Sequence, residues 1–247
     1  MGKSDPHDEQ MLAVTKAVAD KWTGVGEPVK EAAARTELGR ILFQMGQGKE
    51  ALAELRRAAK LFEDNGAGPP AAHALLGCAH ALTIQDRQEE SLEWFERAIK
   101  LFKEVDSVPG ELEASAAKLE ALGDLERWDE THLSDRIMSC TDDVVDPQLR
   151  VLRIVALKYR SQARLAARDV GGAVAPAMEA ADVAHNVGIG SEEAALRLFA
   201  AHGYQLLHKS AQAVEQYKQV IDITRNLSGA AHMKELAVRG LGEALRA

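Results

Sequence analysis

Arg57-Ala58-Ala59-Lys60-Leu61-Phe62 recurs further along the chain as Arg97-Ala98-Ile99-Lys100-Leu101-Phe102. Five of the six residues are identical, and the two copies lie 97 − 57 = 40 residues apart. The same offset carries Glu50-Ala51 onto Glu90-Ser91, so the match extends in register beyond the hexamers. Self-similarity at a fixed period of this length indicates an architecture of stacked repeats.

Weaker copies continue the period along the chain. We expect a small residue at the inner start of the second half of each repeat, at Ala51, Ser91, Thr131, Ala173 and Ala213. Clusters of helix-breaking residues separate the repeats, at 66–70, 107–110, 146–147, 188–191 and 228–229. Shorter turns divide each repeat in two, at 46–48, 85–87, 126–127, 168–169 and 208–209. Each half is long enough for about four turns of helix.

The apolar residues within each half have helical spacing. Leu38, Ile41, Leu42 and Met45 follow one another at steps of 3, 1 and 3. This spacing places them on one face of a helix, whereas a half-buried strand would alternate every second residue. Asp146-Pro147 matches a helix start, with a capping residue followed by proline in the first turn. The sequence therefore predicts an all-α protein made of helix pairs, with no strand.

These residues resemble the tetratricopeptide repeat family. Its pattern has a Leu-Gly pair, a large apolar residue three positions later, and then Ala, an aromatic residue and Ala down the second helix. Leu38-Gly39, Leu42, Ala51, Leu55 and Ala58 follow this pattern closely, and later copies follow it with substitutions. The repeat is about 40 residues long instead of the usual ~34, which is similar to the long repeats of kinesin light chains and bacterial signalling regulators.

The resemblance implies a right-handed superhelical array of antiparallel helix pairs, an α-solenoid in which the first helices line a concave groove. We expect an N-terminal capping helix and linker at 1–26, five helix pairs at 27–227, and a C-terminal capping helix at 228–247. Terminal helices of this kind cover the apolar flanks of an array.

Composition narrows the classes of function. The net charge of −8 and the lack of a dense Lys/Arg stripe argue against nucleic-acid binding. No apolar run approaches the roughly 20 residues that span a bilayer, and the N-terminus lacks the apolar core of a signal peptide. Two cysteines, Cys78 and Cys140, make no disulfide framework. We therefore expect a cytoplasmic protein that binds neither nucleic acid nor membrane.

No enzyme signature survives inspection. The segment Gly46-Gln47-Gly48-Lys49 lacks the spacing of a phosphate-binding loop, so an interhelix turn is the better interpretation. The pairs His73/His80 and His202/His208 lack the i, i+4 spacing of a helical zinc site. We expect no catalytic residue, no metal and no cofactor. Cys78 falls in the packing register, which predicts a buried small apolar residue.

The groove implied by the resemblance is the candidate site. Its positions on successive first helices are Thr36, Arg40, Gln44, His73, His80, Glu113, Glu120, Lys158, Gln162, His202 and Gln205. We expect a non-catalytic adaptor or assembly scaffold that binds a protein or peptide partner there. Three alternatives stay open: a peptide-sensing regulatory module, an enzyme with an unrecognised site, and a solvated polar face without a ligand. Self-association is also open, and Trp94 is either packed on an adjacent repeat or exposed as an anchor.

Overall fold

The computed structural model describes residues 6–142 and 144–246, with side chains from Glu9 onward. Within these residues there are twelve α-helices and no strand. The helices are α1 (Pro6–Val25), α2 (Pro28–Gln44), α3 (Gly48–Asp64), α4 (Gly68–Thr83), α5 (Gln88–Glu104), α6 (Val108–Asp124), α7 (Thr131–Thr141), α8 (Pro147–Ala166), α9 (Val170–Val187), α10 (Gly190–Leu206), α11 (Ser210–Thr224) and α12 (Ala231–Ala244).

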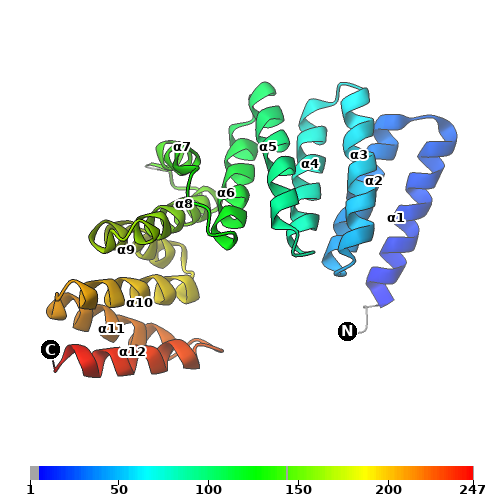
Figure 1. Cartoon of the computed structure of the whole chain (residues 1–247). Helices are drawn as coiled ribbons and strands as arrows, with labels where there is room; N and C mark the ends of the chain where they lie inside the picture. The colour runs from blue at the N-terminus through cyan, green and yellow to red at the C-terminus, as the bar shows by residue number, and fades with distance from the viewer. Residues whose placement is uncertain (1–5, 143, 247) are drawn as a thin grey trace. The chain divides into compact units, whose positions relative to one another are not determined.

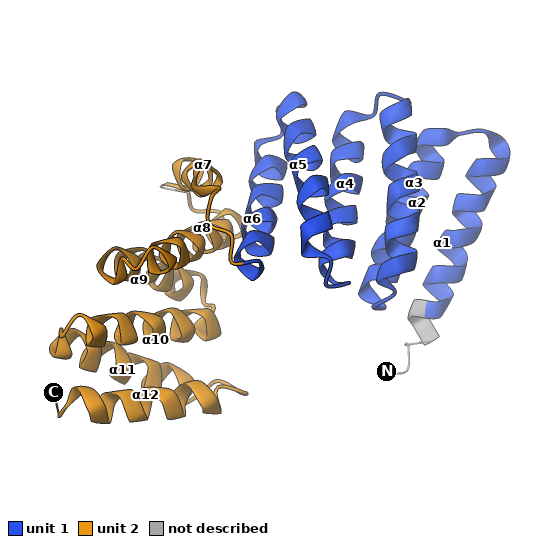
Figure 2. Ribbon diagram, in the orientation of Figure 1, with its two compact units in different colours: residues 1–125 blue, residues 126–247 orange. Residues whose placement is uncertain are grey.

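The helices form two compact units, residues 1–125 and 126–247 (Figure 2). In each unit every helix packs on the next one along the chain, and the short turns make neighbours antiparallel (Figure 1). Among the first helices of the pairs, α2 also contacts α4 and α4 contacts α6, while α10 contacts the terminal helix α12. Both units therefore have the α-solenoid architecture that the sequence predicted. The unit boundary at Leu125 falls between α6 and α7, the two helices of the third predicted pair.

The period is visible in the helix starts. The first helices α2, α4, α6, α8 and α10 begin at Pro28, Gly68, Val108, Pro147 and Gly190, which gives steps of 40, 40, 39 and 43 residues. The second helices α3, α5, α7, α9 and α11 begin at Gly48, Gln88, Thr131, Val170 and Ser210, with steps of 40, 43, 39 and 40.

Every turn between a first and a second helix contains one residue in the left-handed conformation. These residues are Gly46, Asp86, Glu126, Arg168 and His208, with φ between 54° and 74°. After Gly46 the backbone N–H of Gln47 donates to the carbonyl of Leu42 at 2.8 Å, a hydrogen bond that closes the end of α2. A left-handed residue just past the last turn is a common way to end a helix, because it satisfies carbonyls that lack partners inside the helix.

Small buried residues hold the helices close together. Ala51, Ser91, Ala173 and Ala213 are 0–1% exposed, as the repeat register predicted. Cys78 is also fully buried, which confirms its predicted packing role. With few aromatic side chains in the chain, close approach of Ala-rich helix faces provides much of the apolar contact.

The prediction for Thr131 was wrong. Thr131 is exposed and is the first residue of α7, whereas Ser134 is fully buried. The step from the start of α5 to the start of α7 is 43 residues instead of 40, so Ser134 is the residue in register with Ser91. The added residues lie in the turn that precedes α7, where no apolar periodicity marks the slip.

The predicted terminal helices are present as α1 and α12. Residues 1–5 of the first predicted segment and Ala247 of the last lie outside the described residues. α12 packs on α10 and α11, and its Ala237 and Ala244 are buried in the same apolar cluster as Tyr217. The division of the chain into 1–26, 27–227 and 228–247 otherwise stays a prediction from the repeat register.

Candidate functional site

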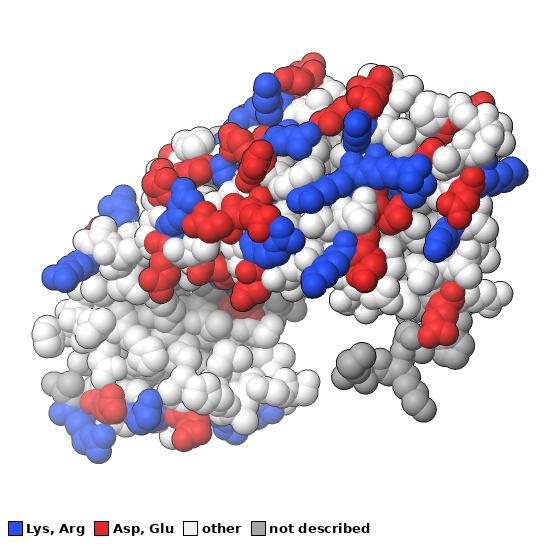
Figure 3. Space-filling view, turned by 45° about the vertical axis from the view of Figure 1, so that its right-hand side comes forward, with Lys and Arg blue, Asp and Glu red and all other residues white. Residues whose placement is uncertain are grey.

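The candidate site is the face of the first helices, taken in each unit by itself. In residues 1–125 this face is built by α2, α4 and α6, and in residues 126–247 by α8 and α10. Figure 3 shows basic and acidic side chains interspersed on the side of the molecule that it displays. This mixture agrees with the absence of a basic track in the sequence.

The three predicted site residues of α2 differ in the hydrogen bonds that they already make within this helix. The Thr36 hydroxyl donates to the carbonyl of Ala32 at 3.0 Å, so it is occupied within α2. Arg40 is half-exposed and donates through Nε to Glu37 at 2.9 Å. Gln44 is exposed at the end of α2. An exposed ion pair contributes little to stability, so the Arg40 guanidinium can exchange Glu37 for another carboxylate at low cost.

The histidines of α4 pack edge-on against aromatic rings of α5. The ring centroid of His80 lies 5.6 Å from that of Phe95 at an interplanar angle of 83°. His73 makes a similar contact with Phe102 at 4.9 Å, and its Nδ1 donates to the carbonyl of Pro69 at 2.8 Å. Burial lowers the pKa of His80, and the carboxylate of Glu113 opposes that shift. His80 therefore favours its neutral form in the folded protein.

The two acidic predicted residues of α6 are both exposed. The charge of Glu113 opposes the lowering of the His80 pKa, so an α6 side chain influences the ionisation of an α4 side chain. Glu120 lies further along α6 and is exposed to solvent. Residues 1–125 thus bring Arg40, His80 and Glu113 onto adjacent first helices with basic, neutral and acidic character respectively.

In residues 126–247 the predicted residues Lys158 and Gln162 line a hollow of about 200 Å³ between α8 and α10. Lys158 Nζ forms an ion pair with Glu192 Oε1 at 2.5 Å, across the gap between the two helices. Leu196 and Phe199 contribute the apolar part of the lining, together with Ala195. The hollow therefore combines an apolar surface with polar groups that lysine, glutamine and glutamate supply.

His202 and Gln205 are tied to the second helix α11. The His202 ring lies 5.6 Å from the ring of Tyr217, and its partial burial there lowers the pKa of His202. Gln205 Oε1 accepts from the Tyr217 hydroxyl at 2.7 Å, and its Nε2 donates to Glu243 at 3.2 Å. Gln205 consequently positions the Tyr217 hydroxyl, and a ligand would have to compete with these contacts.

Sequence reasoning missed two buried charged networks. Arg35 is 5% exposed and donates to Glu31 at 2.7 Å and to Glu54 at 2.6 Å. Arg197 is 8% exposed and donates to Glu193 at 2.8 Å and to Gln216 at 3.2 Å. The spacing of these residues in the sequence could have predicted both pairs. Each Glu precedes its Arg by four residues and therefore lies on the same helix face.

Other expectations concern chemistry and aromatic packing. No group of three His, Cys, Asp or Glu residues suited to a metal ion is found in 6–142 and 144–246. Burial raises the pKa of Cys78 to about 12, so its thiol is a poor nucleophile. Trp94 is half-buried and lies between Arg56 of α3 and Arg97 of α5. Of the two alternatives for Trp94, the structure therefore supports packing on the adjacent repeat. No helix within the described ranges is both long enough and apolar enough to cross a membrane.

Comparison with known proteins identifies the repeats. The tetratricopeptide repeat model matches residues 30–104, which include most of α2 and all of α3, α4 and α5. Residues 30–104 therefore contain tetratricopeptide repeats. No curated protein sequence matches the chain. Beyond residue 104, the tetratricopeptide-like arrangement is supported by the helix packing and by solved structures.

Several solved tetratricopeptide-like structures share the fold at low sequence identity. The apo form of RapI has a TM-score of 0.65 at 12% identity, over 98% of this chain and 92% of RapI. The apo quorum sensor NprR from B. thuringiensis has a TM-score of 0.67 at 12% identity, over 93% of this chain and 65% of NprR. The TPR-like repeats of a predicted kinesin light chain from Podosopora anserina have a TM-score of 0.63 at 18% identity, over 80% of this chain and 95% of that one.

Proposed function

We propose that this protein is a non-catalytic adaptor or assembly scaffold of the cytoplasm that binds a protein or peptide segment on the faces of its first helices. The observation that carries the proposal is the hollow between α8 and α10, where Lys158, Gln162 and Glu192 surround an apolar surface. Sites for peptide side chains combine apolar area with a few placed polar groups in this way. The tetratricopeptide fold is in general a fold for binding proteins and peptides, which supports the same class of function.

In this proposal the apolar floor of the hollow receives a side chain of the partner, and the rim fixes its backbone. Gln162 is exposed and offers both a donor and an acceptor. Lys158 and Glu192 are already paired with one another, so a ligand charge would have to exchange with one of them. In residues 1–125 Arg40 and Glu113 offer further charged contacts.

A second candidate function is a ligand-responsive regulator. The fold likeness to NprR, described as a quorum sensor, extends over 93% of this chain. A regulator of this kind would change its dimensions when a peptide binds, because the ligand selects one of its conformations. Small-angle scattering with and without the captured ligand separates the two functions, since a rigid adaptor keeps its radius of gyration.

The experiment that tests the adaptor proposal is capture of a partner from the source lysate, followed by titration calorimetry with the purified partner. The double variant Arg40→Glu, Lys158→Glu should weaken binding by about tenfold or more, because loss of charged contacts at an interface costs about 2–5 kcal/mol when they are buried. Far-ultraviolet circular dichroism checks that the variant keeps its helicity.

The matched control reverses charge on second helices. Lys60 on α3 and Lys218 on α11 are exposed and remote from the first-helix positions in the repeat register. Arg56 and Lys103 are less suitable as controls, because Arg56 lies over Trp94 and Lys103 lies 3.9 Å from Glu111. Loss of binding in the control Lys60→Glu, Lys218→Glu, with binding intact in the first-helix variant, would refute the proposal.

A further inference from the structure

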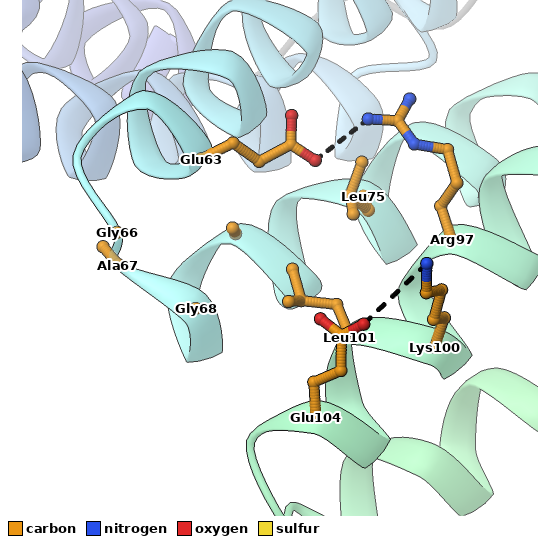
Figure 4. Close-up of a pocket in the computed structure, with 10 residues that line it drawn as sticks. Glu63, Gly66, Ala67, Gly68, Leu75, Arg97, Lys100, Leu101 and Glu104 are labelled. Carbon is orange, nitrogen blue, oxygen red and sulfur yellow. Dashed lines mark hydrogen bonds and ion pairs between the residues drawn. The ribbon is translucent and has the colours of Figure 1, made fainter.

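The second repeat contains a hollow of about 420 Å³ that is separate from the first-helix site. It lies between the end of α3, the first half of α4 and the C-terminal half of α5. Ala71 and Leu75 of α4 and Leu101 of α5 supply its apolar wall, and Arg97 and Lys100 supply cations. Figure 4 shows Glu63 and Arg97 pointing toward one another from α3 and α5. The volume is within the usual range of small-ligand pockets.

In the first repeat, charged side chains occupy the position that corresponds to this hollow. Forty residues before Ala71, Leu75 and Arg97 stand Glu31, Arg35 and Arg57. Glu31 accepts from Arg35 Nε at 2.7 Å, and Arg57 Nη2 lies 2.7 Å from the same carboxylate oxygen. The Glu31 side chain is 8% exposed, so a buried carboxylate occupies this position between two guanidinium groups.

The fifth repeat fills the place in the same way. At an offset of 193 − 31 = 162 residues, Glu193 and Arg197 take the positions of Glu31 and Arg35 and form an ion pair at 2.8 Å. His185 also approaches Glu193, at 3.1 Å. Two repeats that diverge in sequence therefore both place a buried glutamate here and surround it with basic side chains.

The second repeat keeps one basic group of this arrangement and lacks the carboxylate. Ala71 stands where the first and fifth repeats have Glu, and Leu75 stands where they have Arg, which leaves the hollow. Arg97, the equivalent of Arg57, turns to Glu63 at 2.9 Å, and both side chains of that pair are about 40% exposed. Arg97 also lies 4.8 Å over the ring of Trp94, which restrains it at the edge of the hollow.

We propose that this hollow binds the carboxylate of a Glu or Asp side chain from a partner peptide, in the position that Glu31 occupies in the first repeat. Arg97 donates to that carboxylate, Lys100 adds a second positive charge, and the partly exposed Leu101 contacts the methylene groups of the ligand. The site goes beyond the first-helix function, because none of these residues belongs to that face.

The Glu63–Arg97 ion pair does not have to break when the ligand enters. A guanidinium carries five N–H donors and serves two carboxylates at once. Arg35 does so in the first repeat, where it donates to Glu31 at 2.7 Å and to Glu54 at 2.6 Å. Glu63 and Glu104 at the rim balance Arg97 and Lys100 in formal charge, and Lys100 Nζ lies 3.9 Å from Glu104 Oε1. The lining therefore has no net positive charge, which disfavours polyanions such as nucleic acid.

The test uses three blocked pentapeptides, acetyl-Ala-Leu-Xaa-Leu-Ala-amide with Glu, Gln or Lys as Xaa, titrated into the full chain. NMR follows the Arg97 Nε–H signal and the backbone amides of Ala71 and Leu101. The Glu peptide should give saturable shifts at millimolar concentration. The Gln peptide should bind about tenfold more weakly, because it loses a charge-assisted hydrogen bond worth about 1.5 kcal/mol. The Lys peptide should be weaker still.

Two variants remove the site in different ways. Ala71→Glu supplies the carboxylate from within the chain and should abolish the shifts, and Arg97→Gln removes the recognising cation at a partly exposed position. Arg57→Gln is the matched control, because its repeat is already filled by Glu31, and it should bind the Glu peptide like the parent chain. Thermal melts of all variants check the fold.

The proposal would be overturned by the absence of a saturable shift with the Glu peptide, by equal binding of the Glu and Gln peptides, or by unchanged binding in folded Ala71→Glu protein. Tighter binding of the Lys peptide would assign the hollow to Glu63 and Glu104 and would overturn it as well. None of these outcomes bears on the first-helix faces, since Arg40 and Lys158 are intact throughout.

Discussion

His80 on α4 meets the ring of Phe95 on α5 at 5.6 Å, and His202 on α10 meets Tyr217 on α11 at the same distance. The two pairs occupy equivalent repeat positions, one in each compact unit. The sequence identified both histidines as groove residues, but their rings also take part in packing first helix on second helix. Such edge-on contacts contribute to stability beyond the area they bury. Any ligand of the first-helix face would touch rings whose orientation the fold has already set.

His80 should make stability depend on pH. Burial lowers the pKa of His80 in the folded protein, so the unfolded chain binds the proton more readily. The contribution of neutral His80 is complete above its unfolded pKa of about 6.5 and is lost as the pH falls through the lower folded value. Urea unfolding at a series of pH values should show this loss, and NMR titration should give the folded pKa directly. His80→Gln should flatten the dependence, whereas replacement of the exposed His208 should not.

Ala98→Phe should destabilise the first unit. Ala98 is fully buried in one apolar cluster with Phe95 and Phe102, and no space remains for a ring. Overpacking of this kind costs about 1–3 kcal/mol, measured as a decrease in the free energy of unfolding in urea. Ala53→Phe, at an exposed position of α3, is the matched control. If the two variants have the same stability, the packing assignment of Ala98 is wrong.

Gly110→Ala and Gly24→Ala should have opposite effects. A Cβ at Gly110 would meet the buried Phe102 ring, while one at Gly24 would meet nothing within 4 Å. We expect Gly110→Ala to lower the free energy of unfolding by about 1–3 kcal/mol through overpacking. Gly24→Ala, within α1, should raise it by about 0.5–1 kcal/mol, because alanine loses less backbone entropy than glycine. Thermal denaturation in parallel compares them, and a stabilising Gly110→Ala would contradict the observed packing.

Replacement of Arg35 should lower the free energy of unfolding, because it breaks the buried ion pairs of Arg35. Arg35→Gln leaves Glu31 with Arg57 as its remaining cation, so we expect a loss near the lower end of the roughly 3–5 kcal/mol seen when one partner of a buried pair is removed. Arg40→Gln is the control, since the Arg40–Glu37 pair is exposed. Equal melting temperatures for the two variants would show that the Arg35 network contributes nothing.

Acid should weaken the same network. Burial opposes ionisation of Glu31, but the hydrogen bond from Arg35 and the charge of Arg57 outweigh it and hold the pKa of Glu31 below its usual value. Because the folded pKa is lowered, the stabilisation is present above the unfolded pKa of about 4.3 and is lost as the pH falls through the folded value. Glu31→Gln should be less stable at neutral pH and should lose less stability on acidification, which urea unfolding at each pH measures.

The candidate site could be predicted only as a set of positions. Helical periodicity told which residues of a first helix share a face, so Arg40, Lys158 and Gln162 were identified correctly as accessible on these helices. Helical periodicity could not predict which of the site residues form hydrogen bonds or ion pairs with neighbouring helices. Gln205 is tied to Tyr217, and Lys158 to Glu192, through contacts between helices. Such contacts depend on side-chain length and rotamer in two distant segments.

The all-helical fold, the repeat period and the turns could be derived from the amino-acid sequence, because they follow from local spacing and from residues that start or end helices. The sequence also predicted that Cys78 and Ala98 are buried, since both fall on the apolar face of a helix in a repeated register. That Ser134 takes the place predicted for Thr131 became apparent only from the packed helices, because the longer turn before α7 carries no periodic signal. Only the tertiary structure placed Glu31 between Arg35 and Arg57 and left a hollow beside Ala71, because a space between three helices depends on side chains that are far apart in sequence.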